Sequence, residues 1–158
     1  MKPINVGLLG IGTVGGGTWE VLNRNADEIQ RRAGRAIRIT VVADKALQRA
    51  REITGGKAVV TDDAFGVVRG KDVEIVIELI GGYTVAKELV LEAIAHGKHV
   101  VTANKALLAT HGNEIFAAAQ KKGVMVAFEA SVGGGIPIIK ALREGLAANR
   151  IEWIAGII

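Results

Sequence analysis

Short apolar segments alternate along the chain with longer segments in which apolar residues recur at helical spacing. The apolar segments predict strands at residues 4–9, 37–43, 74–80, 99–102, 124–128 and 151–158, and no more than a fragment of a strand at 59–60. The segments between them predict helices at residues 13–32, 47–53, 63–68, 85–95, 104–122 and 137–148. Gly34 is expected to end the first helix and Gly112 to interrupt the fifth. The alternation predicts an α/β fold with a doubly wound, mainly parallel sheet and helices on both faces.

A glycine-rich loop connects the first predicted strand to the first predicted helix. Its sequence, G-x-G-x-x-G, runs over Gly10, Ile11, Gly12, Thr13, Val14 and Gly15. In this context Gly10 permits a tight turn, Gly12 lets the backbone approach a pyrophosphate, and Gly15 lets the helix pack close to the strand. The N–H groups at the start of the helix then face the phosphates. The loop therefore indicates a Rossmann-type dinucleotide-binding domain, with a glycine-rich turn that binds no ligand as the alternative.

An acidic residue at the end of the second strand supports this prediction. Asp44 occupies the position from which a carboxylate binds the ribose hydroxyls. Its charge would repel a 2′-phosphate and so favours NAD, whereas Lys45 and Arg49 are placed to accept that phosphate and favour NADP. The balance favours NAD, and NADP stays open. Asp44 is also a candidate N-cap of the next helix, a role compatible with cofactor binding.

Composition narrows the remaining function classes. The 158 residues are 49% hydrophobic and 23% charged, which suits one domain of an ordinary globular protein. The absence of cysteine excludes disulfides and thiolate chemistry. Basic residues are scattered and aromatics make up only 4%, so nucleic-acid binding has little support. No signal peptide precedes the first strand and no apolar run approaches roughly 20 residues, so we expect a cytoplasmic protein that binds no membrane.

Four stretches carry a more specific resemblance. They are GIGTVGGG at residues 10–17, ELIGG at 78–82, VTANKAL at 101–107 and EASVGGGIP at 129–137. In this order and spacing the chain resembles homoserine dehydrogenases of the bacterial type, over essentially its whole length. The resemblance implies NAD(P)-dependent interconversion of L-homoserine and L-aspartate 4-semialdehyde, in the biosynthesis of threonine and methionine.

The resemblance also implies roles for individual residues. Thr13 and Val14 would contact the cofactor together with the loop glycines. Gly81 and Gly82 follow the fourth predicted strand at the edge where ligands of open α/β sheets bind, and a side chain there would collide with the cofactor. Lys105 would lie at the cofactor and the active site, the alternative being a solvated lysine at a helix start.

The segment from Glu129 to Pro137 predicts a cation-binding loop. Three consecutive glycines leave main-chain carbonyls free to point inward, and a carboxylate with carbonyl oxygens suits a hard cation. The resemblance implies a monovalent cation, usually sodium, bound by Glu129 and the main-chain oxygens of Val132, Gly134 and Ile136. The alternative is a flexible loop in which Glu129 forms a salt bridge.

The resemblance divides the chain into two parts. Residues 1–128 would form the NAD(P)-binding domain, and residues 129–158 a hinge and the first part of a truncated substrate and dimerisation domain. The proton-transfer lysine would lie beyond residue 158, so we expect this chain to bind cofactor but to turn over little homoserine. The full-length enzyme would be a homo-oligomer. Alternatives are another amino-acid-linked dehydrogenase, such as an aspartate dehydrogenase, and a dinucleotide-sensing binding module.

Overall fold

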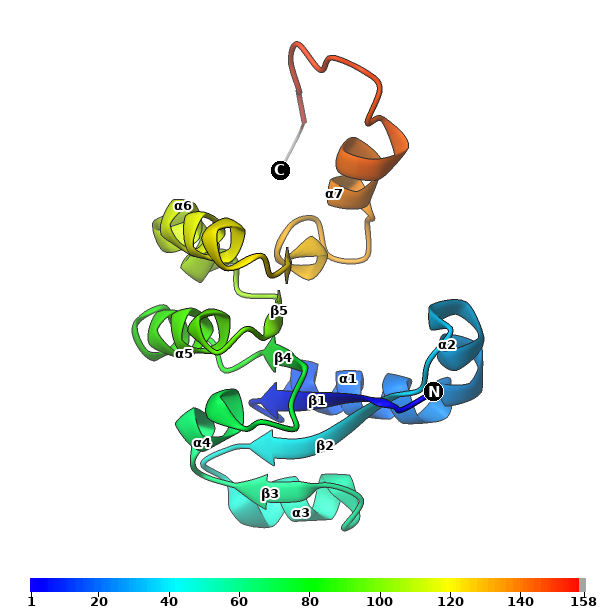
Figure 1. Ribbon diagram of the computed structural model, residues 1–158, viewed down its shortest axis with the longest axis vertical. Coiled ribbons are helices and arrows are strands. Elements are labelled where there is room, and N and C mark those ends of the chain that lie inside the picture. The colour runs from blue at the N-terminus through cyan, green and yellow to red at the C-terminus, as the bar shows by residue number, and fades with distance from the viewer. Residues whose placement is uncertain (157–158) are drawn as a thin grey trace.

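The computed structural model describes residues 1–156 and contains one parallel sheet (Figure 1). The strands are β1 (Ile4–Leu9), β2 (Ile37–Ala43), β3 (Val59–Thr61), β4 (Ile75–Glu78), β5 (His99–Thr102) and β6 (Val126–Ala127). Their order is β3-β2-β1-β4-β5-β6, and every neighbouring pair is parallel. The direction of winding reverses between β1 and β4, which is where doubly wound sheets bind their ligands. The predicted fold class is confirmed.

Helices cover both faces of this sheet. The helices are α1 (Thr13–Arg24), α2 (Ala26–Ala33), α3 (Leu47–Thr54), α4 (Ala64–Arg69), α5 (Thr84–Ala95), α6 (Lys105–Lys122) and, outside the two covering layers, α7 (Ile138–Lys140). One core cluster joins the sheet to α4, α5 and α6, which stand in a row in Figure 1, and contains Leu89, Leu107 and Ile115. The other joins the sheet to α1 and α3 through Trp19 and Ala50. Burial on both faces explains why the strands are almost continuously apolar.

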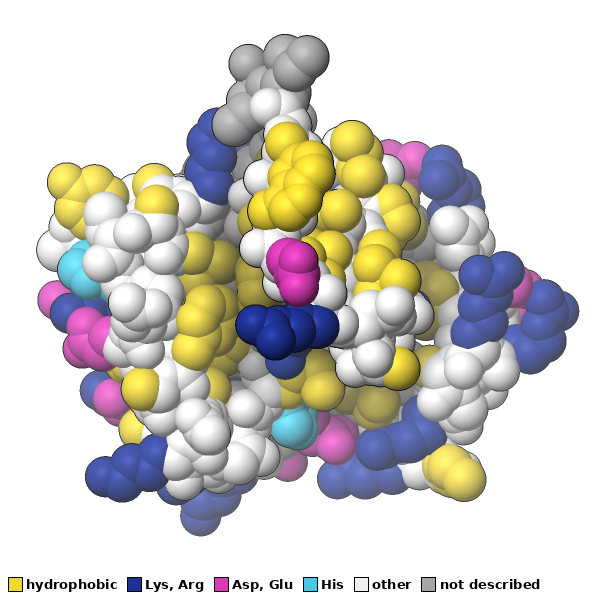
Figure 2. Space-filling view, turned by 90° about the horizontal axis from the view of Figure 1, so that it is seen from above, with side chains coloured by type: hydrophobic (Ala, Val, Ile, Leu, Met, Phe, Trp, Pro, Cys, Tyr) yellow, Lys and Arg dark blue, Asp and Glu magenta, His cyan; other side chains and the backbone are white. Residues whose placement is uncertain are grey.

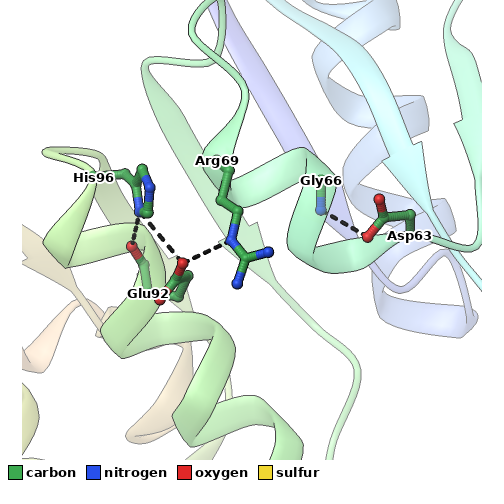
Figure 3. Close-up of polar contacts among 5 residues, drawn as sticks. All are labelled: Asp63, Gly66, Arg69, Glu92 and His96. Atoms are coloured by element: carbon green, nitrogen blue, oxygen red, sulfur yellow. Dashed lines mark hydrogen bonds and ion pairs between the residues drawn. The ribbon is translucent and has the colours of Figure 1, made fainter.

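An ion pair connects α4 to α5 on the outside of this layer (Figure 3). Asp63 caps α4 by accepting a 2.7 Å hydrogen bond from the Gly66 amide. Arg69, the last residue of α4, donates from Nε to Oε1 of Glu92 at 2.7 Å. This hydrogen bond is the largest cause of the lowered pKa of Glu92; burial opposes it, and the charges of Arg69 and His96 add smaller lowering effects. The contact lies at the C-terminal ends of the two helices, and therefore at the edge of the sheet opposite to the carboxyl ends of the strands.

The first predicted helix is wrong in one respect, because it is broken into α1 and α2 at Asn25. This residue has φ −104° and ψ 21°, outside the helical region. Asparagine side chains compete with the helical backbone for hydrogen bonds, which favours a turn here. The end of α2 is as predicted, with Gly34 in the left-handed conformation at φ 73°.

The predicted interruption at Gly112 is also wrong. Helix α6 runs without a break from Lys105 to Lys122. Its apolar side packs into the core, where Leu107 and Ile115 have no exposed surface. A glycine inside a helix costs only about 1 kcal/mol relative to alanine, and this packing is sufficient to offset it.

The C-terminal elements are shorter than predicted. Strand β6 has two residues instead of five, and the helix expected at residues 137–148 consists of α7 and a π-helical turn, η2 (Ala141–Gly145). Neither α7 nor η2 has a buried residue, and short helices without packing are marginal. The strand expected at residues 151–158 is not formed at 151–156, which pair with no other strand. Ile157 and Ile158 lie outside the described residues.

This end of the molecule exposes a large apolar surface. Figure 2 views it from the β6 side and shows apolar side chains gathered there. Met125, Ile136, Trp153 and Ile154 are each more than 60% exposed. A groove of 720 Å³ runs along β6 between Phe116 and Arg143, with mostly apolar neighbours. Within residues 1–156, no helix combines the length and the apolar character that crossing a membrane requires.

Candidate cofactor-binding cleft

The three glycines of the G-x-G-x-x-G pattern differ in what a side chain would meet. Gly10 has φ +86°, and a Cβ atom there would lie 2.8 Å from the main-chain oxygen of Leu79. A Cβ atom on Gly15 would overlap the main-chain oxygen of Gly10. A Cβ atom on Gly12 would meet no atom within 4 Å. The fold itself therefore requires Gly10 and Gly15, whereas Gly12 borders open space.

That open space is part of a 540 Å³ cleft between the turn after β1 and the turn after β4. The lining residues are Gly10, Gly12, Asp44, Lys45, Leu79, Ile80, Gly81, Gly82, Tyr83, Thr84 and Val85. Six of the predicted cofactor-binding residues thus lie around one cleft at the carboxyl edge of the sheet. Helix α1 begins beside it with no side-chain cap and no acidic residue in its first turn. Its first N–H groups are therefore available to an anion.

Asp44 holds the glycine loop to the end of β2. Its Oδ2 accepts a 2.7 Å hydrogen bond from the amide of Ile11, and its Oδ1 accepts one of 2.8 Å from the amide of Ala46. The predicted N-cap role is wrong, because α3 begins after Ala46 and Asp44 instead closes a local turn. Asp44 is half-buried and still faces the cleft.

The two basic residues considered for a 2′-phosphate lie in different places. Lys45 is exposed on the wall of the 540 Å³ cleft. Arg49 lines a second cleft, of 660 Å³, between α1 and α3, together with Arg24 and Lys57. The structure therefore brings Lys45, and not Arg49, next to Asp44 in the predicted binding cleft.

The other predicted cofactor residues, Thr13, Val14, Gly15 and Lys105, do not line the 540 Å³ cleft. Thr13 belongs to the second cleft, and Val14, in the first turn of α1, is 58% exposed. Lys105 is exposed as the first residue of α6. The preceding residue, Asn104, connects this helix start to the cleft, because its Nδ2 donates a 2.5 Å hydrogen bond to the main-chain oxygen of Gly82.

A buried carboxylate next to the cleft was missed as a functional residue. Glu78, the last residue of β4, has no exposed surface. It accepts hydrogen bonds from the Thr102 hydroxyl at 2.7 Å and from the Ile80 amide at 3.0 Å. The sequence did contain a signal, since a glutamate interrupts the otherwise apolar strand at residues 75–80. Buried carboxylates in such strands require partners, which the sequence does not identify.

The Glu129–Pro137 loop follows β6 and begins with a 3₁₀ turn, η1 (Glu129–Ser131). The two carboxylate oxygens of Glu129 accept 2.8 Å hydrogen bonds from the amides of Ile139 and Lys140, at the start of α7. The other candidate ligand residues, Val132, Gly134 and Ile136, are exposed. Across residues 1–156, no group of three His, Cys, Asp or Glu side chains is arranged to hold a metal ion. A cation at this loop would therefore depend mainly on carbonyl oxygens.

Comparisons with known proteins agree with this geometry. Residues 10–129 match the family described as "Homoserine dehydrogenase, NAD binding domain". All of the chain aligns with homoserine dehydrogenases from Methylobacillus glycogenes, at 63% identity, and Pseudomonas aeruginosa, at 61%. It spans only 38% and 36% of the length of these relatives. The crystal structure of a homoserine dehydrogenase from Thiobacillus denitrificans is similar over 97% of this chain and 35% of its own, with 66% identity and a TM-score of 0.91.

Proposed function

The chain belongs to the homoserine dehydrogenase family, whose NAD-binding domain it matches, and on this premise we propose that it binds NAD or NADP in the cleft between β1 and β4. The observation that carries the proposal is the contrast among the loop glycines. Gly10 and Gly15 are required by contacts within the protein, but a Cβ atom on Gly12 would meet no protein atom, and Gly12 lines the cleft. At the second glycine of a G-x-G-x-x-G turn between a strand and a helix, this open space suits the close approach of a pyrophosphate.

We propose NAD as the preferred cofactor. The Asp44 carboxylate is held by two amides and faces the cleft, so it stays in place to accept hydrogen bonds from the ribose hydroxyls. The Lys45 side chain is exposed and long, and holding it against a phosphate costs side-chain entropy. A fixed carboxylate therefore opposes a 2′-phosphate more strongly than this lysine attracts it.

The family supports a wider proposal about the reaction. A protein that carries this domain and the substrate-binding part of the family would interconvert L-homoserine and L-aspartate 4-semialdehyde, with the cofactor accepting or donating the hydride. We place Lys105 at the border of the cofactor and substrate regions, because Asn104 connects its helix start to Gly82 in the cleft wall. A cytoplasmic location and a homo-oligomeric assembly of that protein belong to the same proposal.

Residues 129–158 are proposed to begin the substrate and dimerisation part, with residues 1–128 as the cofactor domain. The exposed apolar side chains beyond β6 support this division, since apolar patches of this kind are typical of surfaces that contact another part or partner. We also propose that the Glu129–Pro137 loop binds sodium through Glu129 and the carbonyls of Val132, Gly134 and Ile136. Because both carboxylate oxygens of Glu129 already accept hydrogen bonds at the start of α7, main-chain oxygens would supply most of the donors beside Glu129, which suits such an ion.

Calorimetric titration of the chain with NAD and NADP separately tests the proposal. We expect saturable binding of both, with NAD the tighter ligand, and binding of neither would refute the cofactor assignment. Thermal unfolding in sodium chloride and in choline chloride of equal ionic strength tests the loop. Sodium is expected to raise the melting temperature, and identical melting curves in the two salts would refute the cation site.

A further inference from the structure

Thr102 is the meeting point of hydrogen bonds from three segments. It is the last residue of β5, is 1% exposed, and lies opposite Glu78 across the β4–β5 pair. Its hydroxyl donates to Oε2 of Glu78 at 2.7 Å and accepts from the amide of Asn104 at 3.0 Å. Its main-chain oxygen accepts a 2.9 Å hydrogen bond from the hydroxyl of Ser131. One residue thus contacts the end of β4, the start of α6 and the Glu129–Pro137 loop.

The partners of Thr102 hold the cleft wall from both sides. The other carboxylate oxygen of Glu78 accepts from the amide of Ile80, just before the turn. The side chain of Asn104 donates to the main-chain oxygen of Gly82, at the end of the turn. A displacement of Thr102 would therefore act on the turn through Glu78 and, separately, through Asn104.

The turn itself has few other contacts. Gly81 and Gly82 have φ +74° and +68°, both in the left-handed region, and both are exposed. A Cβ atom built on either would meet no atom within 4 Å. The Leu79 amide donates to the main-chain oxygen of Leu9 before the turn, and beyond that point the hydrogen bonds at Ile80 and Gly82 hold the cleft wall.

We propose that Thr102 is a positioning residue that transmits the position of the Glu129–Pro137 loop to the Gly81–Gly82 turn, and that Ser131 is the loop's point of attachment. The inference rests on the proposed cofactor cleft. Its consequence is that cofactor affinity depends on Ser131, although Ser131 does not line the cleft. A loop at the hinge thereby controls the shape of the binding site from outside it.

Variants with and without the two hydroxyls test this. Ser131→Ala and Thr102→Val each remove one connection, Thr102→Ser retains the hydroxyl, and Thr110→Val removes an exposed hydroxyl that bonds only within α6. We expect Ser131→Ala and Thr102→Val each to raise the calorimetric Kd of NAD about fivefold or more. The double variant should resemble the more severe single variant, because the two act in series. Thr102→Ser and Thr110→Val should bind as the unmodified chain does.

Amide hydrogen exchange at Ile80 provides a second measurement that needs no cofactor. It should accelerate in Ser131→Ala and stay unchanged in Thr110→Val. Unchanged NAD affinity and unchanged Ile80 exchange in Ser131→Ala would overturn the inference, even if Thr102→Val fails to fold. Additive effects of Ser131→Ala and Thr102→Val on binding would also overturn it. If the unmodified chain binds neither NAD nor NADP, the proposed function fails, and the exchange of Ile80 still decides whether the loop is coupled to the turn.

Discussion

Three alanine substitutions in the glycine-rich segment separate the requirements of the fold from those of the cofactor. A methyl group at Gly15 overlaps the main-chain oxygen of Gly10, which belongs to the backbone and has no rotamer by which to move away. Helix α1 would have to shift relative to β1. A methyl group at Gly12 or Gly17 meets no protein atom within 4 Å. Gly12 has φ −64°, which alanine adopts without strain.

The sizes of the effects follow from these contacts. Gly15 and Gly17 both lie in α1, so alanine gains similar helix propensity at each, about 1 kcal/mol. The difference between the two variants therefore isolates the overlap, which we expect to cost about 1–3 kcal/mol of unfolding free energy. For a chain of this size each kcal/mol corresponds to about 2–4 °C in Tm. Gly12→Ala, at the N-cap position, should lose no more than about 1 kcal/mol.

Cofactor binding should follow a different order. Gly12→Ala places its methyl group where the pyrophosphate would lie, so the Kd of NAD should rise at least about tenfold, equivalent to about 1.4 kcal/mol. Gly17 lines only the second cleft, and Gly17→Ala should bind as the unmodified chain does. Denaturant unfolding and calorimetry on the same samples measure both quantities. Equal stability of Gly15→Ala and Gly17→Ala would refute the steric argument, and normal binding by Gly12→Ala would refute the position of the pyrophosphate.

Three further predictions concern charged side chains. Since the pKa of Glu92 is lowered by Arg69, their contact stabilises the fold above the unfolded-state pKa and is lost as the pH falls through the lowered value. Thermal unfolding of Glu92→Gln should therefore depend less steeply on pH in the acid range, and a slope equal to that of the unmodified chain would contradict this. Lys98 is 7% exposed and its Nζ donates to two main-chain oxygens, at 2.6 and 2.7 Å, so Lys98→Met should lower the unfolding free energy by about 1–3 kcal/mol without changing the Kd of NAD. Asp44→Asn should raise the affinity for NADP relative to NAD in parallel titrations, and an unchanged ratio would remove Asp44 as the determinant of cofactor choice.

The sequence predicted the elements well where the local pattern and the final packing agree. Strands β1, β2 and β5 have the predicted bounds, because each is an apolar run buried between two helix layers. The errors occur where tertiary contacts decide. Packing keeps α6 continuous through Gly112, and the lack of packing leaves α7 and η2 short. Neither outcome follows from the spacing of residues along the chain.

The sequence predicted those cleft residues whose position depends only on where the strands end. Gly12, Asp44 and Gly81 lie in the turns that follow strands, so the parallel topology alone brings them to one edge of the sheet. The roles of Glu78 and Thr102 depend instead on the register between β4 and β5, which places the two residues opposite each other. Register of this kind is a property of the assembled sheet, and no local pattern in either strand indicates it.

The two walls of the cleft are nevertheless held by the same kind of interaction, a hydrogen bond from a backbone amide to a carboxylate. After β2, Asp44 accepts a hydrogen bond from the amide of Ile11 in one turn, and at the end of β4, Glu78 accepts one from the amide of Ile80 in the other. The difference lies in burial, because Asp44 is half-buried and faces the cleft, whereas Glu78 has no exposed surface. A ligand in the cleft can therefore reach the first carboxylate directly but can depend on the second only through the turn that it positions. On the proposed function, the same chemical group would serve recognition on one wall and positioning on the other, and the exposed surface of each carboxylate distinguishes the two roles.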